Sequence, residues 1–185
     1  MIWKAAVPMI CFLGFIIGGF ISKAFCDEVL KGKRILLISW KVVLAAICLI
    51  LLHKEFVLWA FLAGIAIGLF LKVPMLFLGL ALVSAWHGPQ HTLFIISSLI
   101  FAFGMAYSSY LLARGLCSKV AFILELLFFA PLLLLFANPI SLEFLPSLAA
   151  GALIPCMILK GSLIYRFRQP KNKRGTAKTK KRRKD

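Results

Sequence analysis

Long apolar stretches constrain the fold of this chain more than any other feature. A helix needs about 20 apolar residues to cross the hydrocarbon core of a bilayer, with a range of about 17–25. Seven apolar runs are present, at residues 5–21, 35–52, 56–71, 73–86, 93–112, 120–137 and 142–165. Inside a bilayer, backbone amides must be paired within the protein, and helices satisfy this requirement. The pattern therefore predicts an all-α, polytopic transmembrane helical bundle of about seven spans, formed by residues 1–165.

The third and fourth runs are shorter than the others and only Lys72 separates them. Pro74 follows at once, and proline interrupts a helix that would otherwise continue. Two arrangements fit this segment. It forms either a tight hairpin of two short spans or a re-entrant pair that does not cross the membrane.

The distribution of basic residues predicts the orientation of the bundle, because positive charge is retained on the cytoplasmic side. Alternate loops carry most of the bases, namely Lys23, Lys31, Lys33 and Arg34 in the first loop, Lys72 in the third, and Arg114 and Lys119 in the fifth. The basic tail follows the last span. We therefore expect the N-terminus outside and the C-terminus inside, in the cytoplasmic membrane of a prokaryote.

The C-terminal tail, residues 166–185, differs in composition from the rest of the chain. It holds 11 Lys/Arg and one acid, a net charge of +10 out of +16 for the whole chain. With so few apolar residues it cannot bury enough surface to fold alone, so we expect a disordered cytoplasmic tail. Anionic lipid headgroups are its expected partner, and RNA or the ribosome is the competing one.

Two ionisable residues fall inside predicted spans, where charge is costly and often functional. Lys41 lies seven residues past Arg34, and Glu125 lies six residues past Lys119. At 1.5 Å per residue these are depths of about 10 Å and about 9 Å from the cytoplasmic face. The matched depth makes Lys41 and Glu125 a candidate ion pair. The alternative is that Lys41 extends to the interface while Glu125 faces water or is protonated.

Small residues mark candidate sites of close helix packing. Gly14 and Gly18 share one helix face, as do Gly64 and Gly68, and such pairs let a neighbouring backbone approach. In the fifth span, a polar face combines Ser97, Gly104 and Ser108. Two interpretations of this face are open, polar packing between helices and part of a path for a substrate.

No catalytic, cofactor-binding or metal-binding motif is apparent in the sequence. His87 and His91 are separated by a Gly-Pro turn with no acid between them, so a polar turn is favoured over a metal site. The five cysteines show no CxxC spacing and are expected to pack as small apolar side chains. We expect no cofactor and no metal, and the sequence favours a protein that is not an enzyme.

Short matches indicate a tandem relation between spans one to three and spans five to seven. Glu55-Phe56 precedes Ala63-Gly64, and Glu143-Phe144 precedes Ala150-Gly151. A three-plus-one-plus-three arrangement of this kind is typical of small transporters built from parallel repeats.

Three fragments carry a resemblance to a known family: Leu13-Gly14-Phe15-Ile16, Asp27-Glu28-Val29-Leu30-Lys31-Gly32 and Ile164-Tyr165-Arg166-Phe167-Arg168. They resemble parts of the bacterial acyl-phosphate-dependent glycerol-3-phosphate acyltransferases. The resemblance implies seven spans in the same orientation and a basic tail. The family's phosphate-binding Gly-Ser-Gly-Asn and Lys-Gly-Gly-Lys stretches are missing here, so no catalytic residue is carried over.

Three functions remain compatible with the sequence. The first is a non-catalytic membrane protein that binds lipids or a membrane-protein partner, favoured by the lack of motifs. The second is a small solute transporter, favoured by the Lys41/Glu125 depth match and the polar face of the fifth span. The third is a divergent lipid enzyme related to the acyltransferases.

Overall fold

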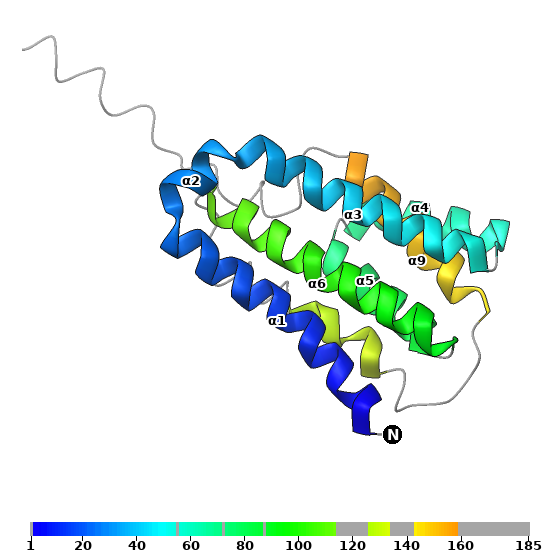
Figure 1. The fold of residues 1–185 in the computed structure, drawn as a ribbon. Helices are drawn as coiled ribbons and strands as arrows, with labels where there is room; N and C mark the ends of the chain where they lie inside the picture. Colours follow the sequence, from blue (N-terminus) through cyan, green and yellow to red (C-terminus); the bar gives the residue numbers. More distant parts are fainter. Residues whose placement is uncertain are drawn as a thin grey trace, which may run out of the picture.

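The described part of the chain consists of helices and short connections (Figure 1). The computed structural model describes residues 2–54, 56–71, 73–86, 88–113, 126–133 and 143–158. Its elements are α1 (Ile2–Ala24), α2 (Cys26–Lys31), α3 (Lys33–Lys54), α4 (Leu58–Leu71), α5 (Pro74–Trp86), α6 (Gln90–Ala113), the 3-10 turns η1 (Leu127–Phe129) and η2 (Pro131–Leu133), and α9 (Leu145–Ile158). The expected all-helical fold is confirmed for these residues.

Among the described residues, three helices are long and apolar enough to cross a membrane, by length and composition. These segments are Ala6–Ala24 in α1, Arg34–His53 in α3 and Gln90–Leu111 in α6. The helices α4, α5 and α9 are apolar but shorter. This content of apolar helix indicates a membrane-associated protein.

Two pairs of helices form the frame of the bundle. α1 packs mainly against α6, and α4 packs mainly against α9. In Figure 1, α1 in blue and α6 in green lie side by side and run in the same direction. α3 contacts both pairs, because it packs against α6 and α9. We call the end of the bundle where α2 joins α1 to α3 the α2 end, and α6 finishes there as well.

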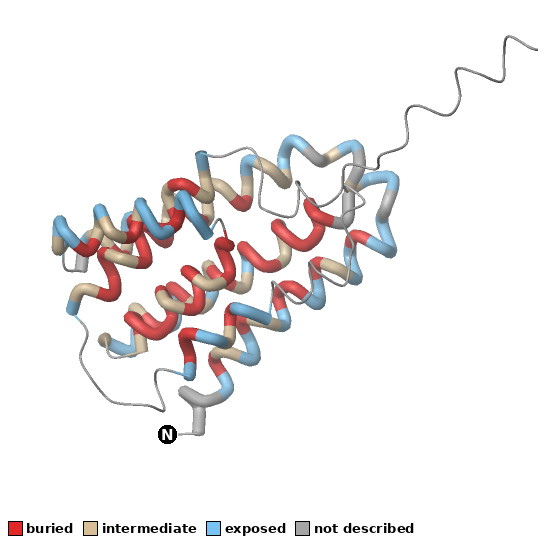
Figure 2. Tube along the Cα trace, turned by 180° about the vertical axis from the view of Figure 1, so that it is seen from behind, coloured by how far each residue is buried: buried red, intermediate tan, exposed pale blue. Residues whose placement is uncertain are grey.

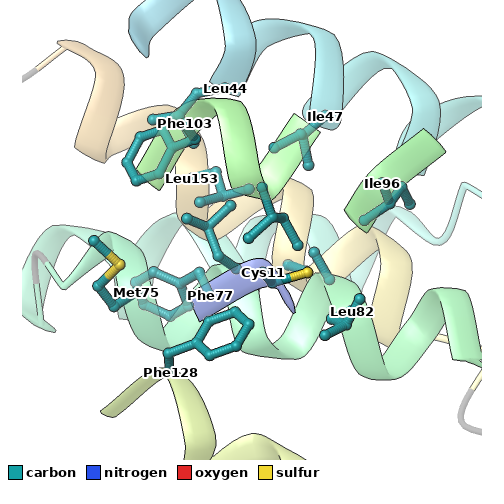
Figure 3. Close-up of a cluster of buried hydrophobic side chains, with 14 of the residues drawn as sticks. Cys11, Leu44, Ile47, Met75, Phe77, Leu82, Ile96, Phe103, Phe128 and Leu153 are labelled. Atoms are coloured by element: carbon teal, nitrogen blue, oxygen red, sulfur yellow. The ribbon is translucent and has the colours of Figure 1, made fainter. Parts of the chain in front are cut away.

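α5 lies in the middle of the bundle. Ten of its 13 residues are buried, and they occur on every side of the helix, in keeping with the rule that a helix apolar all round is a buried one. Figure 2 shows the buried residues gathered along the inner helices, with exposed residues on the outer ones. In Figure 3, Phe77 and Leu82 of α5 lie among Phe103 of α6, Leu153 of α9 and Phe128 of η1. The fourth apolar run is therefore a central helix, separate from α4.

α2 is a helix that the sequence analysis did not anticipate, since it lies in the first predicted loop. Asp27 and Glu28 occupy its first turn and Lys31 its last. Acids near a helix N-terminus and bases near its C-terminus interact favourably with the helix dipole. This charge order explains why six residues between two longer helices adopt a helical turn of their own.

The sixth apolar run was expected to form a regular span, and its described part departs from that expectation. Residues 126–133 form the two short 3-10 turns η1 and η2. The backbone N–H groups of Ala130 and Leu133 bond to carbonyls three residues back, at 3.2 Å each. Pro131 lies between these turns and has no N–H to donate, so a continuous α-helical ladder is interrupted there.

Candidate functional site

The glycines of α1 bring its backbone against that of α6. A Cβ atom added to Gly14 would lie 3.0 Å or less from the backbone of Phe101, and one added to Gly18 would lie 2.7 Å from the Cα of Met105. Cβ atoms do not occur closer than 3.0 Å to such neighbours. The first glycine pair thus sits at a helix contact, and its partner is α6.

The polar face of α6 lies against α1. Gly104 is buried where an added Cβ would lie 3.0 Å from the backbone nitrogen of Phe15. The hydroxyl of Ser108 is buried and donates to the Gly104 carbonyl at 2.8 Å. Ser97 is half-buried, and its hydroxyl donates to the Phe94 carbonyl at 2.9 Å. Both hydroxyls thus bond within α6, and of the two only that of Ser108 is buried at the contact with α1. Whether this face serves packing or a substrate path stays open.

Two serines that the sequence analysis did not single out connect the same helices at the α2 end. The hydroxyl of Ser22 donates to the Ser109 carbonyl at 3.4 Å, and the hydroxyl of Ser109 donates to the Gly18 carbonyl at 2.9 Å. Both side chains are buried. Serine hydroxyls commonly join helices across a membrane interface. Ser22 continues the spacing of Gly14 and Gly18 by four residues, and Ser109 follows Ser108, so an extended search for small residues would have found both.

The second glycine pair packs against α9. A Cβ added to Gly64 would contact the backbone of Leu148 and Ala152, with the Ala152 nitrogen at 3.0 Å. A Cβ added to Gly68 would also lie within 3.0 Å of the Ala152 backbone. Backbone contacts of this kind cannot be relieved by rotating a side chain. The separation of α4 and α9 is therefore set by glycine.

The contact between α4 and α9 is reciprocal. Gly64 faces Leu148 and Ala152, while Gly151 faces Phe61 and Ile65. The residues of this contact correspond in pairs that are 87 positions apart in the chain. These pairs are Gly64 and Gly151, Phe61 and Leu148, and Ile65 and Ala152. The two helices thus contact each other through equivalent positions.

The same register occurs in the other pair. Ser22 bonds to Ser109, and the two are 87 positions apart. Gly14 faces Phe101, and Gly18 faces Met105, again with a difference of 87 in both cases. Other contacts of this pair have different offsets, 89 for Gly104 with Phe15 and 91 for Ser109 with Gly18. The tandem relation read from the sequence therefore stays a prediction.

Lys41 lies beside an aromatic cluster between α3 and α6. Its Nζ is 5.9 Å from the centre of the Trp40 ring, and the side chain is half-buried. Trp40 itself is buried against Phe103, Tyr107 and Tyr110, with ring centres 5.8–6.4 Å away. Sequence reasoning missed this cluster, although aromatic residues at 103, 107 and 110 recur at helical spacing.

Several residues of interest lie outside the part of the chain that the structure describes. Glu125, the expected partner of Lys41, is one of them, as are His87 and the tail at 166–185. The proposed Lys41/Glu125 pair stays a prediction. Of the two histidines in the predicted polar turn, His91 is exposed at the start of α6.

Three cysteines are partly or fully buried in helices. The Cys11 thiol contacts the Ser97 carbonyl at 3.5 Å, and the Cys48 thiol contacts the Ala150 carbonyl at 3.7 Å. Cys156 is half-buried in α9. Within the described residues no group of three His, Cys, Asp or Glu side chains could hold a metal ion. The thiols serve as small packing groups with weak hydrogen bonds.

Comparison of this chain with protein-family models, curated proteins and solved structures finds no match. The resemblance to the glycerol-3-phosphate acyltransferases therefore stays a prediction. Of the fragments that carry it, residues 13–16 lie in α1 and residues 27–32 cover most of α2, while residues 164–168 fall outside the described part.

Proposed function

We propose that this chain is a seven-span integral membrane protein that binds lipids or another membrane protein without catalysing a reaction. Its N-terminus is outside and its tail is in the cytoplasm. The described helices support the topology, since α1, α3 and α6 have spanning length and α4, α5 and α9 are apolar. Exposed Lys23, Lys31 and Arg34 share the α2 end, which is the cytoplasmic end under the positive-inside rule.

The short central helix is compatible with this arrangement. Thirteen residues of α5 extend about 20 Å at 1.5 Å per residue, less than the hydrocarbon thickness of about 30 Å. A helix enclosed by other helices meets protein at its ends and need not match the bilayer. α5 packs against α6, α9, η1 and η2, so it has such an enclosure.

The observation that carries the functional proposal is the position of α5. A solute path requires space between the helices, and α5 fills the interior with residues such as Phe77, Leu78 and Leu82, each 1% exposed or less. Large apolar side chains instead face outward on α4, including Trp59 at 63% exposed and Phe70 at 85%. An outer apolar surface around a filled core is suited to contact with lipids and partner helices.

The test uses the full chain purified in a mild detergent. A photo-crosslinking residue in place of Phe70 is expected to capture lipid or a membrane protein, whereas the same residue in place of buried Phe77 is expected to capture neither. Vesicles containing the protein are expected to take up labelled solutes no faster than empty vesicles. Saturable uptake of a solute would contradict the proposal.

A second candidate, a small solute transporter, is supported by the reciprocal contact of α4 and α9, in which corresponding residues are 87 positions apart. Parallel repeats related by an axis along the membrane normal occur in transporters. Its discriminating experiment is a disulfide between Ser22→Cys and Ser109→Cys, introduced where the Ser22 hydroxyl bonds to the Ser109 backbone carbonyl. Transport by repeat movement is expected to stop on oxidation and to resume on reduction.

A further inference from the structure

The outer side of α3 carries an apolar row near the α2 end of the bundle. Ile35, Ile38 and Val42 are 70%, 60% and 59% exposed. They are three and four residues apart, so they share one face of the helix. Trp40 is buried on the opposite side of α3, against rings of α6. The three exposed residues, which we call the α3 stripe, therefore face away from the bundle.

Arg34 stands at the end of the α3 stripe. It is exposed, and it is the first residue of the span Arg34–His53. Ile38 and Val42 follow it by four and eight residues, so Arg34 and the stripe share one side of the helix. At 1.5 Å per residue Val42 is about 12 Å deeper than Arg34, less than half of a hydrocarbon core of about 30 Å. An acyl chain that lies on the stripe therefore places its headgroup beside Arg34.

Lys31 adds a second exposed base just before α3. Helical hydrogen bonds continue across the junction of α2 and α3. The Gly32 N–H donates to the Glu28 carbonyl at 2.8 Å, and the Leu36 N–H donates to the Gly32 carbonyl at 3.1 Å. Lys31 and Arg34 are thus three residues apart on a helical course, a spacing at which side chains are neighbours. Two neighbouring bases at the end of an apolar row are complementary to an anionic headgroup above its acyl chain.

The acids of α2 favour Arg34 over Lys31 as the main phosphate ligand. Asp27 and Glu28 are exposed in the first turn of α2. They precede Lys31 by four and three residues, the spacing at which opposite charges interact on a helix. Arg34 has no acid three or four residues away in either direction along the sequence. Arginine also binds phosphate through two parallel N–H bonds, which makes its recognition more specific.

The outer face of α4 provides a comparison. Trp59 and Leu62 are also exposed there, but α4 (Leu58–Leu71) contains no charged residue. Both faces are apolar, and only that of α3 has bases at its end. Charge complementarity therefore separates the α3 stripe from an apolar face that accepts any lipid.

We propose that α3 binds an anionic phospholipid from the leaflet at the α2 end. Arg34, assisted by Lys31, holds the lipid phosphate, and an acyl chain lies on the α3 stripe. This inference rests on the lipid-binding function proposed above, and it names the lipid class and the site.

The test uses the full chain in vesicles of equal phosphatidylglycerol and phosphatidylcholine. A photo-crosslinking residue replaces Ile38, and mass spectrometry identifies the lipid that it captures. Phosphatidylglycerol is expected to be captured in preference to phosphatidylcholine. The same residue in place of Leu62, on the outer face of α4, is the positional control and should show no preference.

Matched charge variants identify the phosphate ligand. Arg34→Gln should lower the preference at Ile38 by about fivefold, because one base near an anionic leaflet contributes about that factor. Lys23→Gln removes an exposed base from the last turn of α1, at the same end of the bundle, and should leave the preference unchanged. All of these side chains are exposed, so every variant is expected to fold. Inorganic phosphate, with ionic strength matched by chloride, should not reduce the capture of phosphatidylglycerol.

The outcomes separate this site from the general function. Equal capture of the two lipids at Ile38, or an equal effect of Arg34→Gln and Lys23→Gln, would overturn the site while leaving lipid binding intact. Capture of a second copy of the chain would assign the α3 stripe to a dimer contact and overturn the lipid site. Displacement by inorganic phosphate would show a site for free anions and overturn the phospholipid assignment. No captured lipid at Ile38, Leu62 or Phe70 would overturn the proposed lipid binding as well.

Discussion

Replacing Gly64 by alanine tests whether backbone contact sets the spacing of α4 and α9. The added methyl would lie 3.0 Å from the Ala152 nitrogen and closer still to the Leu148 carbonyl, whereas ordinary contact starts at 3.4 Å. Both obstacles are backbone, so the helices must separate locally. A gap of about 0.5–1 Å loses about a quarter to a half of the dispersion attraction across a contact.

We expect Gly64→Ala to lower the free energy of unfolding by about 2 kcal/mol, within the range of about 1–3 kcal/mol for overpacked cores. The intrinsic helix preference for alanine over glycine, about 1 kcal/mol, acts in the opposite direction. The sign of the change therefore distinguishes a close contact from open space. Ala66→Leu on the exposed side of α4 adds more volume and should change stability by less than about 0.5 kcal/mol.

The reciprocal position provides a second measurement. Gly151→Ala should cost a similar amount, and the double variant should cost about 1 kcal/mol less than the sum, because the first methyl already separates the same helices. Unfolding in mixed micelles with increasing SDS, followed by far-UV circular dichroism, gives all four values. A more stable Gly64→Ala, a costly Ala66→Leu or strictly additive losses would refute the reasoning.

Three further predictions concern topology, the charged residues and the tail. Cysteines placed at Gln90 and Lys180 should be labelled from opposite sides of the membrane, and labelling from one side would contradict the orientation. Lys41→Met and Glu125→Gln should each destabilise the protein more than the double variant does, with purely additive losses in unfolding experiments excluding the pair. A peptide of residues 166–185 should bind anionic vesicles at low salt and dissociate as salt screens the charges. Equal binding to neutral vesicles would exclude electrostatic binding, and a preference for RNA would favour the ribosome as the partner.

Hydropathy was sufficient to predict where most helices lie, because long apolar runs have few alternatives to helix. Hydropathy could not predict that α5 is central. Lipid and the protein interior favour the same apolar side chains, so a buried helix and a lipid-facing helix have similar sequences. Glycine spacing likewise marked Gly64 as a contact without naming its partner. The partner is the face of α9 that holds Gly151, and its distance along the chain gives no indication that the two faces meet.

The other omissions have local physical causes. α2 is too short to show a hydrophobic period, and only the order of its charges indicates a helix. Trp40 gave no signal in the sequence because a tryptophan in an apolar run is ordinary. Its surroundings depend on the rings that α6 places around it.

The offset of 87 residues also has a consequence for synthesis. At about 5–20 residues per second, a ribosome takes about 4–17 s to make 87 residues. During that interval α4 has been made but α9 has not, and the glycine face of α4, with Gly64 and Gly68, lacks the helix that later covers it. The same delay applies to α1 and α6. Each of these two helices is therefore made with a glycine face that its partner helix covers only seconds later.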